Sequence, residues 1–337
     1  MKIVRGIVFV GFVAIGFGLI QTLFMRKSGS SAAIRDFYET PHDVDVIAVG
    51  PSYVYCTYNT VEAYRVAGLS SYLPCTPCQP IEASYYFLKE AFKSYRPRVA
   101  VLGATMFVWD AKPYVCADAF LHEATDSMPF NFDKIKMLDD CVLTEAIETH
   151  LFPFMKYHSR WRELGKDDFS RHFVNRSLFE GFKIMDKIFD SKGNKLIDLM
   201  DVAPAPVHPE CLAWLNRFAS LAKENGCPLV LLISPRFDSD RRRLGRYVPL
   251  CQRARELGIE VLNLNELSFT NDDFYDGDHL NVIGSEKATK HIVKFLQEHF
   301  DLKPSMSDAE KSRWEEMSKR YDEQKAEVFR KSKRKVN

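Results

Sequence analysis

Short apolar runs alternate with segments of helical period along most of this chain, and this alternation limits its fold more than any other feature. The apolar runs lie at 44–50, 68–73, 98–103, 228–234 and 259–265. Successive parallel strands need a crossover connection between them, usually a helix, and the helices then cover the sheet. The pattern therefore predicts an α/β fold with a five-stranded parallel sheet between two layers of helices.

The intervening segments have the spacing of amphipathic helices. We predict helices at 81–95, 209–226, 239–258 and 282–300. Gly226 and Gly258 stand where the C-terminal ends of two of these helices are expected. This arrangement is typical of a flavodoxin-like three-layer sandwich, whose ligands bind beyond the carboxyl ends of the strands. We therefore expect functional residues in the loops that follow the strands.

The N-terminal segment predicts a single membrane span. Residues 6–25 are uncharged and mainly apolar, and twenty residues at about 1.5 Å each match a hydrocarbon core about 30 Å thick. Hydrophobicity on all sides and flanking bases disfavour a buried core helix. The long apolar run, with no clear cleavage site after it, disfavours a removed signal peptide. The flanking bases do not set the orientation, but single N-terminal anchors usually lead a translocated domain, so we expect the rest of the chain outside the cytoplasm.

The chain then divides into further regions. We interpret 28–41 as a linker, 42–302 as the main domain and 107–205 as a mostly helical insertion that shapes a cleft. Mixed charges at helical spacing in the tail, 303–337, predict a solvated or frayed helix, or alternatively a basic end attracted to anionic lipid or polymer. The near balance of 46 Lys and Arg against 45 Asp and Glu excludes a uniformly basic nucleic-acid binder, and we expect no nucleic-acid partner.

Eight cysteines leave two interpretations open. They could form disulfides outside the cell, or serve as small buried apolar residues in a reducing compartment. The Cys75-Thr76-Pro77-Cys78 sequence resembles a redox or half-zinc motif, but the chain has no second CxxC and no nearby histidine pair. A local bridge or a plain turn explains it better. We expect no metal and no organic cofactor.

Two loops that follow predicted strands carry residues suited to nucleophilic catalysis. Ser52 follows the first strand in a Gly-Pro-Ser-Tyr turn, which would lift its hydroxyl above the sheet and free its backbone N–H. Asp276 and His279 follow the fifth strand, at a spacing that lets the carboxylate reach Nδ1 while Nε2 points outward. A serine nucleophile needs such a base, and the imidazole needs a carboxylate. We predict that Ser52, His279 and Asp276 form a catalytic cluster at one sheet edge.

These two blocks resemble those of the SGNH/GDSL hydrolase superfamily. The sequence at 50–52 is similar to that family's Gly-x-Ser loop after the first strand, and the Asp-Gly-Asp-His sequence at 276–279 is similar to its Asp-x-x-His near the domain end. The resemblance covers roughly 42–300. An anchor followed by such a domain also resembles an envelope-facing subgroup related to the teichoic-acid D-alanylation protein DltD and to alginate O-acetylation proteins. The resemblance implies a serine esterase or O-acyltransferase acting on an acylated envelope glycan, with a membrane-bound acyl donor as a compatible partner.

Two blocks of that superfamily are altered in this chain. Where the family has a glycine amide for the oxyanion after the second strand, the candidate here is the backbone N–H of Cys78, beside that of Ser52. Where it often has an asparagine after the third strand, the nearest polar residue is Thr105. Losing one oxyanion donor typically costs about 10²–10³ in rate. A catalytically inactive relative that binds carbohydrate or assists assembly is therefore the alternative, and a thiol redox protein is a third interpretation.

Several of these residues also have ordinary structural interpretations. Ser52 could cap the following helix, and Asp276 and His279 could be turn residues. His158, in an aromatic and basic stretch of the insertion, is a candidate for substrate binding, although such clusters more often pack an insertion onto its domain. Arg236, after the fourth strand, could bind an anionic substrate or pair with an acidic neighbour.

Overall fold

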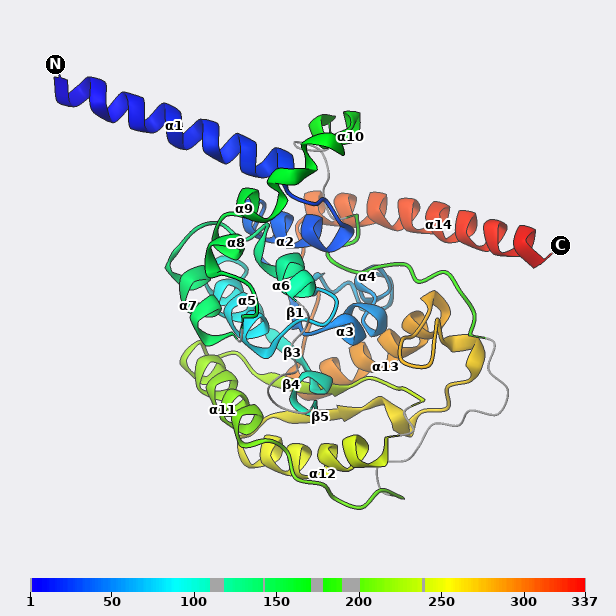
Figure 1. The fold of residues 1–337 in the computed structure, drawn as a ribbon. Helices are drawn as coiled ribbons and strands as arrows, with labels where there is room; N and C mark the ends of the chain where they lie inside the picture. The colour runs from blue at the N-terminus through cyan, green and yellow to red at the C-terminus, as the bar shows by residue number, and fades with distance from the viewer. Residues whose placement is uncertain are drawn as a thin grey trace.

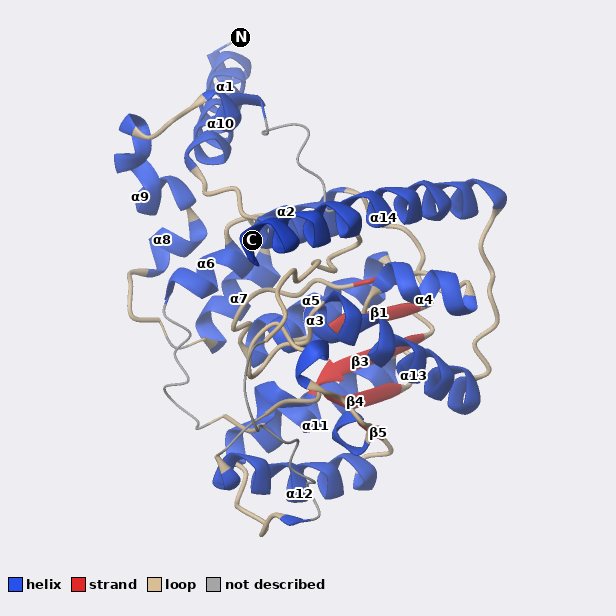
Figure 2. Cartoon of the chain, turned by 90° about the vertical axis from the view of Figure 1, so that its right-hand side faces the viewer, coloured by secondary structure: helices blue, strands red, loops and turns tan. Residues whose placement is uncertain are grey.

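The computed structural model describes residues 2–109, 118–141, 143–170, 178–189, 201–237 and 240–336. A five-stranded parallel sheet in the order β2-β1-β3-β4-β5 forms the centre of the molecule (Figures 1 and 2). The strands are β1 (Val46–Val49), β2 (Ser71–Tyr72), β3 (Val99–Gly103), β4 (Leu229–Ile233) and β5 (Glu260–Asn263). Each strand lies within one of the five apolar runs, so the predicted parallel sheet is confirmed.

Helices cover both faces of the sheet and complete the three-layer sandwich. One face packs against α2 (Gly29–Glu39), α5 (Ile81–Ser94), α11 (Pro209–Glu224) and α12 (Arg241–Glu256). The other packs against α3 (Ser52–Thr57), α4 (Thr60–Ala67), α13 (Val282–Phe300) and α14 (Asp308–Val336). Alternation along β1 shows the physical basis, because Ile47 and Val49 enter the first core while Val46 and Ala48 enter the second. Gly226 and Gly258 follow α11 and α12 with φ of 62° and 74°, as expected.

Most of residues 28–41 forms the helix α2 (Gly29–Glu39), which packs into the core, so the linker interpretation is wrong. Ser28 caps α2 by accepting a hydrogen bond from the Ser31 amide at 3.0 Å. Ile34 and Phe37, one turn apart, are fully buried, and the Phe37 ring stacks on that of Tyr95 with centroids 4.8 Å apart. The small residues at the start of this segment hid an apolar face, formed mainly by Ile34 and Phe37, that is sufficient to anchor a short helix.

The C-terminal tail also belongs to the folded domain. Trp314 and Tyr321 of α14 are fully buried, and Met317 between them is 8% exposed. The Tyr321 hydroxyl accepts a hydrogen bond from Asn59 Nδ2 at 2.9 Å and donates one to Glu286 Oε1 at 2.6 Å. The prediction of a solvated or frayed helix therefore fails for the first half of α14, because its three buried residues form a continuous stripe on one side of the helix.

The described residues of the insertion between 118 and 170 are mostly helical, as predicted, whereas the described segment 178–189 contains no helix. The insertion contains α6 (Asp118–Thr125), α7 (Phe132–Asp140), α8 (Ile147–Leu151), α9 (Pro153–Tyr157) and α10 (Lys166–Ser170), with no strand in its described residues. The remainder of the predicted span, 107–205, includes positions outside the described residues.

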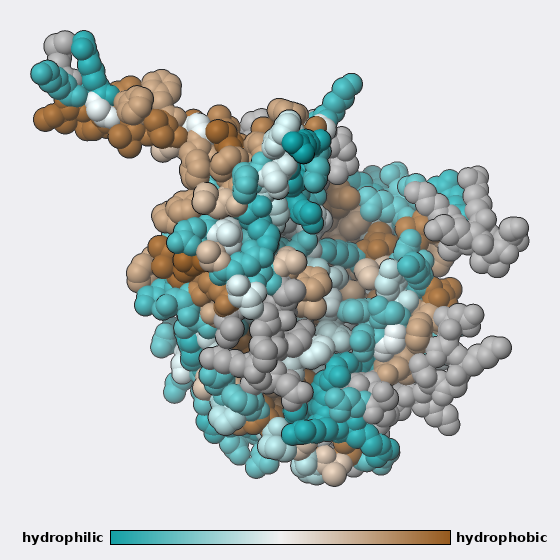
Figure 3. All heavy atoms as spheres, in the orientation of Figure 1, coloured by the Kyte–Doolittle hydropathy of each residue, from teal (hydrophilic) through white to brown (hydrophobic). Residues whose placement is uncertain are grey.

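The N-terminal helix α1 (Lys2–Phe24) extends away from the sandwich, and Figure 3 shows its largely hydrophobic surface. None of its residues is buried, and it is long and apolar enough to cross a membrane. Its C-terminal end contacts the insertion, because the rings of Phe24 and Phe154 meet edge to face at 5.1 Å. An Arg160 guanidinium N–H also donates to the Met25 carbonyl at 3.0 Å. These features fit a membrane span or a signal sequence.

Candidate active site

The turn after β1 places Ser52 at the carboxyl edge of the sheet. Gly50 has a φ of 148°, a conformation that favours glycine. A Cβ on Gly50 or on Gly103, at the end of β3, would lie 2.7 or 2.6 Å from Val54 Cγ2. The two glycines therefore let α3 begin directly above the ends of β1 and β3. Pro51 occupies the N-cap without a side-chain hydrogen bond, so Ser52 is not the helix cap and its hydroxyl is available for another contact.

Ser52, His279 and Asp276 lie in hydrogen-bond contact. The Ser52 Oγ is 2.8 Å from His279 Nε2, and His279 Nδ1 is 3.0 Å from each carboxylate oxygen of Asp276. An ionised carboxylate only accepts hydrogen bonds, so Nδ1 carries the imidazole proton and Nε2 accepts from the serine hydroxyl. This arrangement can move a proton from Ser52 to His279 while Asp276 stabilises the resulting cation.

The Asp276 carboxylate is held by the backbone as well as by the imidazole. Its Oδ1 accepts hydrogen bonds from the N–H groups of Asp278 and His279, each at 2.8 Å. Partial burial raises the pKa of Asp276, but the hydrogen bonds from His279 and the Asp278 amide outweigh this effect and the pKa falls below its ordinary value. Asp276 is therefore ionised at neutral pH, as the proton-bearing Nδ1 requires.

A short hairpin fixes the His279 loop at the start of α13. Phe274 and Leu280 form an antiparallel bridge, and the Tyr275 N–H donates to the His279 carbonyl at 2.8 Å. Asn281 caps α13 through its side-chain oxygen, while its Nδ2 donates to the Phe274 carbonyl at 3.0 Å. The cap and the bridge together hold the imidazole over the end of β1.

Two aromatic or basic side chains flank the cluster, Tyr53, which was not anticipated from the sequence, and Arg236, which was a candidate. The Tyr53 ring stacks on the His279 ring with centroids 4.9 Å apart, and the Arg236 guanidinium lies 5.0 Å from the Tyr53 ring centroid. Arg236 Nη2 donates to Asp278 Oδ1 at 3.0 Å, and Arg236 is only 2% exposed. The structure thus favours the ion-pair interpretation of Arg236 over contact with an anionic substrate. No local sequence pattern indicated these contacts, because Tyr53, Arg236 and His279 come after three different strands, β1, β4 and β5.

The oxyanion candidates lie in three different environments. Ser52 is the first residue of α3, so no carbonyl of that helix accepts its N–H. Cys78 lies in the loop after β2, the strand next to β1, and has a φ of 47°. The Thr105 side chain is directed into the core, where it is 1% exposed and its hydroxyl lies 3.3 Å from that of Tyr247. The hydroxyl of Thr105 is therefore not presented to a substrate in this conformation.

His158 is not brought to the Ser52 cluster. Its Nδ1 lies 3.0 Å from the Met155 carbonyl oxygen and its ring is 6.3 Å from that of Phe154. This region adjoins the end of α1 and is separate from α3 in both Figure 1 and Figure 2. His158 is an exposed residue of the insertion near α1 and takes no part in the Ser52 cluster.

Another part of the insertion does flank the candidate site. The Phe189 N–H donates to the Phe274 carbonyl at 2.9 Å, and the Val282 N–H donates to the Met185 carbonyl at 3.1 Å. The segment 182–189 consequently runs beside the hairpin that carries His279.

The described cysteines are free thiols, including both cysteines of the CxxC sequence. Cys75 is fully buried, and its Sγ lies 3.3 Å from the Ala48 carbonyl oxygen. Burial raises the pKa of the Cys75 thiol well above its ordinary value, which disfavours the reactive thiolate. These observations favour a plain turn over a local bridge or a redox site. Cys116 lies outside the described residues.

The fold and the cluster define an α/β protein with a parallel sheet covered on both faces and a Ser-His-Asp contact at the carboxyl edge. No protein-family model matches the chain, and no curated protein matches its sequence.

Proposed function

We propose that this chain is a membrane-anchored serine esterase or O-acyltransferase of the SGNH/GDSL type that acts on an acylated cell-envelope glycan. The observation that carries the proposal is the 2.8 Å contact between Ser52 Oγ and His279 Nε2, with Nδ1 of the same imidazole bonded to Asp276. The order of the residues adds support. The serine follows β1 and the Asp-x-x-His sequence precedes α13, as in the superfamily that the sequence resembles.

In the first step, Ser52 Oγ attacks the carbonyl carbon of an ester and its proton passes to His279 Nε2. The negative charge develops on the former carbonyl oxygen, which the backbone N–H groups of Ser52 and Cys78 would stabilise. The bond to the alkoxide leaving group then breaks, and His279 returns the proton to that oxygen. An acyl group remains esterified to Ser52.

In the second step, water or a sugar hydroxyl attacks the acyl carbon while His279 accepts its proton. The bond to Ser52 Oγ breaks and the serine regains a proton from His279. Water as the acceptor gives an esterase, whereas a sugar hydroxyl gives an O-acyltransferase. Both outcomes use the same relay and need no change in oxidation state.

The exposed apolar helix α1 supports a membrane location for this chemistry. None of its residues is buried, so a bilayer would satisfy the surface that the protein leaves uncovered. We expect the chain to remain in the membrane fraction after alkaline carbonate extraction, with its mature N-terminus still preceding residue 6. Removal of the segment before residue 28 during secretion would instead identify α1 as a signal sequence.

A carbohydrate-binding or assembly protein without catalytic activity is the second candidate. It is favoured by the position that follows β3, where an alanine and a buried threonine replace the usual oxyanion asparagine. In this case the Ser-His contact would persist without supporting turnover.

Covalent labelling with a fluorophosphonate separates the two candidates. We expect the full-length protein in detergent to be labelled at Ser52, because the relay raises the nucleophilicity of that hydroxyl. The Ser52→Ala variant should not react. Ser268→Ala, which alters an exposed serine in the loop after β5, should react like the wild type.

A wild-type protein that unfolds cooperatively but resists the probe would overturn the enzyme proposal and favour the binding protein. For a reactive enzyme, release of acetate from acetylated glycans, measured with and without an added acceptor glycan, distinguishes hydrolysis from transfer. Transfer requires the acceptor to gain the acyl group in proportion to the donor's loss.

A further inference from the structure

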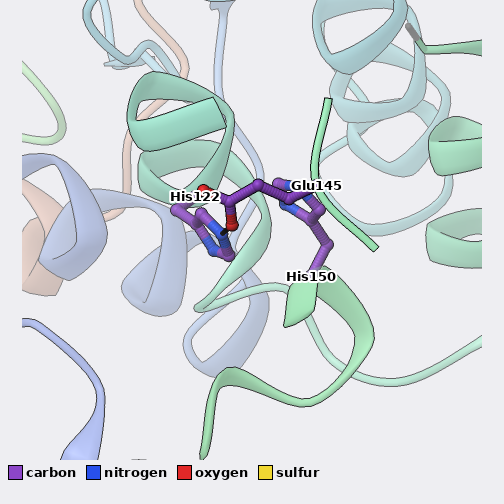
Figure 4. Close-up of side chains that lie close together, drawn as sticks. All are labelled: His122, Glu145 and His150. Atoms are coloured by element: carbon purple, nitrogen blue, oxygen red, sulfur yellow. Dashed lines mark ion pairs between the residues drawn. The ribbon is translucent and has the colours of Figure 1, made fainter. Parts of the chain in front are cut away.

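A second cluster of chemically capable side chains lies in the helical insertion and shares no residue with the Ser52 relay. His122 of α6, His150 of α8 and Glu145 between these helices converge (Figure 4), and one candidate ligand atom from each lies within 4.8 Å of the other two. The two histidines are 1% and 0% exposed. Their rings stack with centroids 4.0 Å apart. Buried polar atoms usually have hydrogen-bond partners. The two nitrogen atoms of each buried imidazole therefore need partners.

One nitrogen of each imidazole is held by a carboxylate. His122 Nδ1 lies 2.7 Å from Asp126 Oδ1, and His150 Nε2 lies 3.2 Å from Asp118 Oδ1. The opposite nitrogens, His122 Nε2 and His150 Nδ1, are buried and have no hydrogen-bond partner among the described residues. Glu145 Oε2 lies 3.5 Å from His122 Nε2. A metal-binding histidine usually has one ring nitrogen bonded to a carboxylate, and its other nitrogen binds the metal. The carboxylate fixes the tautomer and increases the basicity of the ligand nitrogen.

The charge of the cluster suits a divalent cation. Its three carboxylates, Asp118, Asp126 and Glu145, face two ammonium groups, that of Lys156, which is bonded to Glu145 Oε1, and that of the buried Lys134, which interacts with Asp126. With neutral imidazoles, one negative charge remains uncompensated within this set.

We propose that His122 Nε2, His150 Nδ1 and Glu145 Oε2 bind one divalent transition-metal ion, with Zn²⁺ as the preferred ion and water as the fourth ligand. Two imidazoles and one carboxylate are a common donor set for zinc. Tetrahedral zinc with Zn–N distances of about 2.0–2.1 Å places its ligand atoms about 3.3 Å apart. Binding therefore draws these atoms together from within 4.8 Å and turns the two stacked rings, which lie at 14° to each other, so that both nitrogen lone pairs point at the ion.

The position of the site indicates a structural role. The ion would join α6 to α8, and these helices contact α2 and α9, which in turn contact the sandwich and α1. It would therefore stiffen the layer between the sandwich and the apolar helix. This inference departs from the expectation of no metal, because the three ligands are dispersed along the chain and form no compact motif.

Zinc titration of the full-length protein tests the proposal. The protein, freed of metal with EDTA and kept in detergent, is titrated calorimetrically with ZnCl₂. We expect one equivalent to bind. Glu145→Gln should weaken binding at least about tenfold, because it removes a charged ligand. Glu148→Gln alters an exposed glutamate on α8 and should bind like the wild type. Zn²⁺ should raise the Tm of the wild type and of Glu148→Gln more than that of Glu145→Gln.

His150→Asn provides a second test, with Co²⁺ as a spectroscopic probe. The absorption bands of bound Co²⁺ should lack thiolate charge transfer, which excludes the cysteines as ligands. If His150→Asn does not fold, Glu145→Gln decides the matter, because its side chain is 32% exposed and tolerates the change. A wild type that binds no zinc, or binds it with the affinity of Glu145→Gln, would overturn the proposal.

Discussion

At the scale of single residues, the Asp276 carboxylate orients the imidazole and also shapes the loop that carries it. It accepts hydrogen bonds from two backbone N–H groups and from His279 Nδ1. The backbone bonds explain why Asp276 stays in place although its side chain is 44% exposed. Its lowered pKa keeps it ionised until the pH falls below the ordinary range of aspartate.

We predict that Asp276→Asn reacts with the fluorophosphonate about 10³–10⁴ times more slowly than the wild type. An asparagine amide would donate to Nδ1 and so force the imidazole proton onto Nε2, where it cannot accept from Ser52. Pseudo-first-order labelling rates at pH 7 measure the effect. Asp272→Asn, an exposed carboxylate in the same loop, is the matched control, and equal rates for both variants would contradict the relay.

Lys134 provides a residue-scale prediction about stability and pH. It is 1% exposed, and burial lowers its pKa from 10.5 to about 8 against the opposing effect of Asp126. Between these values the unfolded chain binds the proton and the folded chain does not, so the free energy of unfolding rises with pH. The cost of the buried charge is therefore fully present below pH 8 and disappears towards pH 10.5.

Accordingly, Lys134→Met should stabilise the protein at pH 7 by about 1–3 kcal/mol. The advantage over the wild type should shrink as the pH rises from 8 to 10. Urea denaturation at several pH values measures both effects. Lys136→Met, an exposed neighbour on α7, should change little, and a difference that grows with pH would refute the assignment.

At the scale of elements, the site depends on how closely α3 approaches β3. Val54 of α3 lies against both Gly50 and Gly103. Gly103 has a φ of −67°, which any residue can adopt, so a substitution there acts through contact alone. This contact sets the height of α3 above the sheet and, with it, the position of Ser52.

Gly103→Ala should destabilise the protein by about 1–3 kcal/mol and slow labelling of Ser52, because the new methyl group displaces Val54. Shortening Val54 removes the clash. The double variant Gly103→Ala/Val54→Ala should therefore recover part of the labelling rate lost in the single variant. Additive losses in the double-mutant cycle would show that the two positions do not interact.

At the scale of the whole molecule, the C-terminal helix closes one face of the sandwich. Trp314 is fully buried in the core formed with α4 and α13, whereas Trp161 of the insertion is 61% exposed. We predict that Trp314→Ala lowers the free energy of unfolding by about 3–5 kcal/mol. Trp161→Ala should lower it by less than about 0.5 kcal/mol. Thermal and urea unfolding measure both, and comparable losses would show that α14 is not integral to the domain.

The sequence predicted those features that depend on local pattern. Each strand appeared as an apolar run, and Gly226 and Gly258 marked the ends of α11 and α12. The pairing of Asp276 with His279 was predictable because a three-residue spacing allows it within one turn. The contact of Ser52 with His279 followed from the rule that post-strand loops share one sheet edge.

The errors came from segments that contain few large apolar residues. Residues 28–41 contribute Ile34 and Phe37 to the core, and the tail contributes Trp314 and Tyr321. Their surrounding residues are small or charged, so composition alone suggested a linker and a solvated helix. Whether such sparse apolar positions are buried depends on a complementary surface elsewhere in the chain, which periodicity does not reveal.

The amino-acid order by itself determined the five strands, the parallel sheet and the edge at which Ser52 and His279 would meet, because strand period, helix period and turn chemistry act over a few residues. Only the tertiary structure decided that Tyr53 stacks on His279, that Arg236 pairs with Asp278, and that His122, Glu145 and His150 converge. Such contacts join residues whose separation in space is set by long-range packing, and no local pattern records that distance.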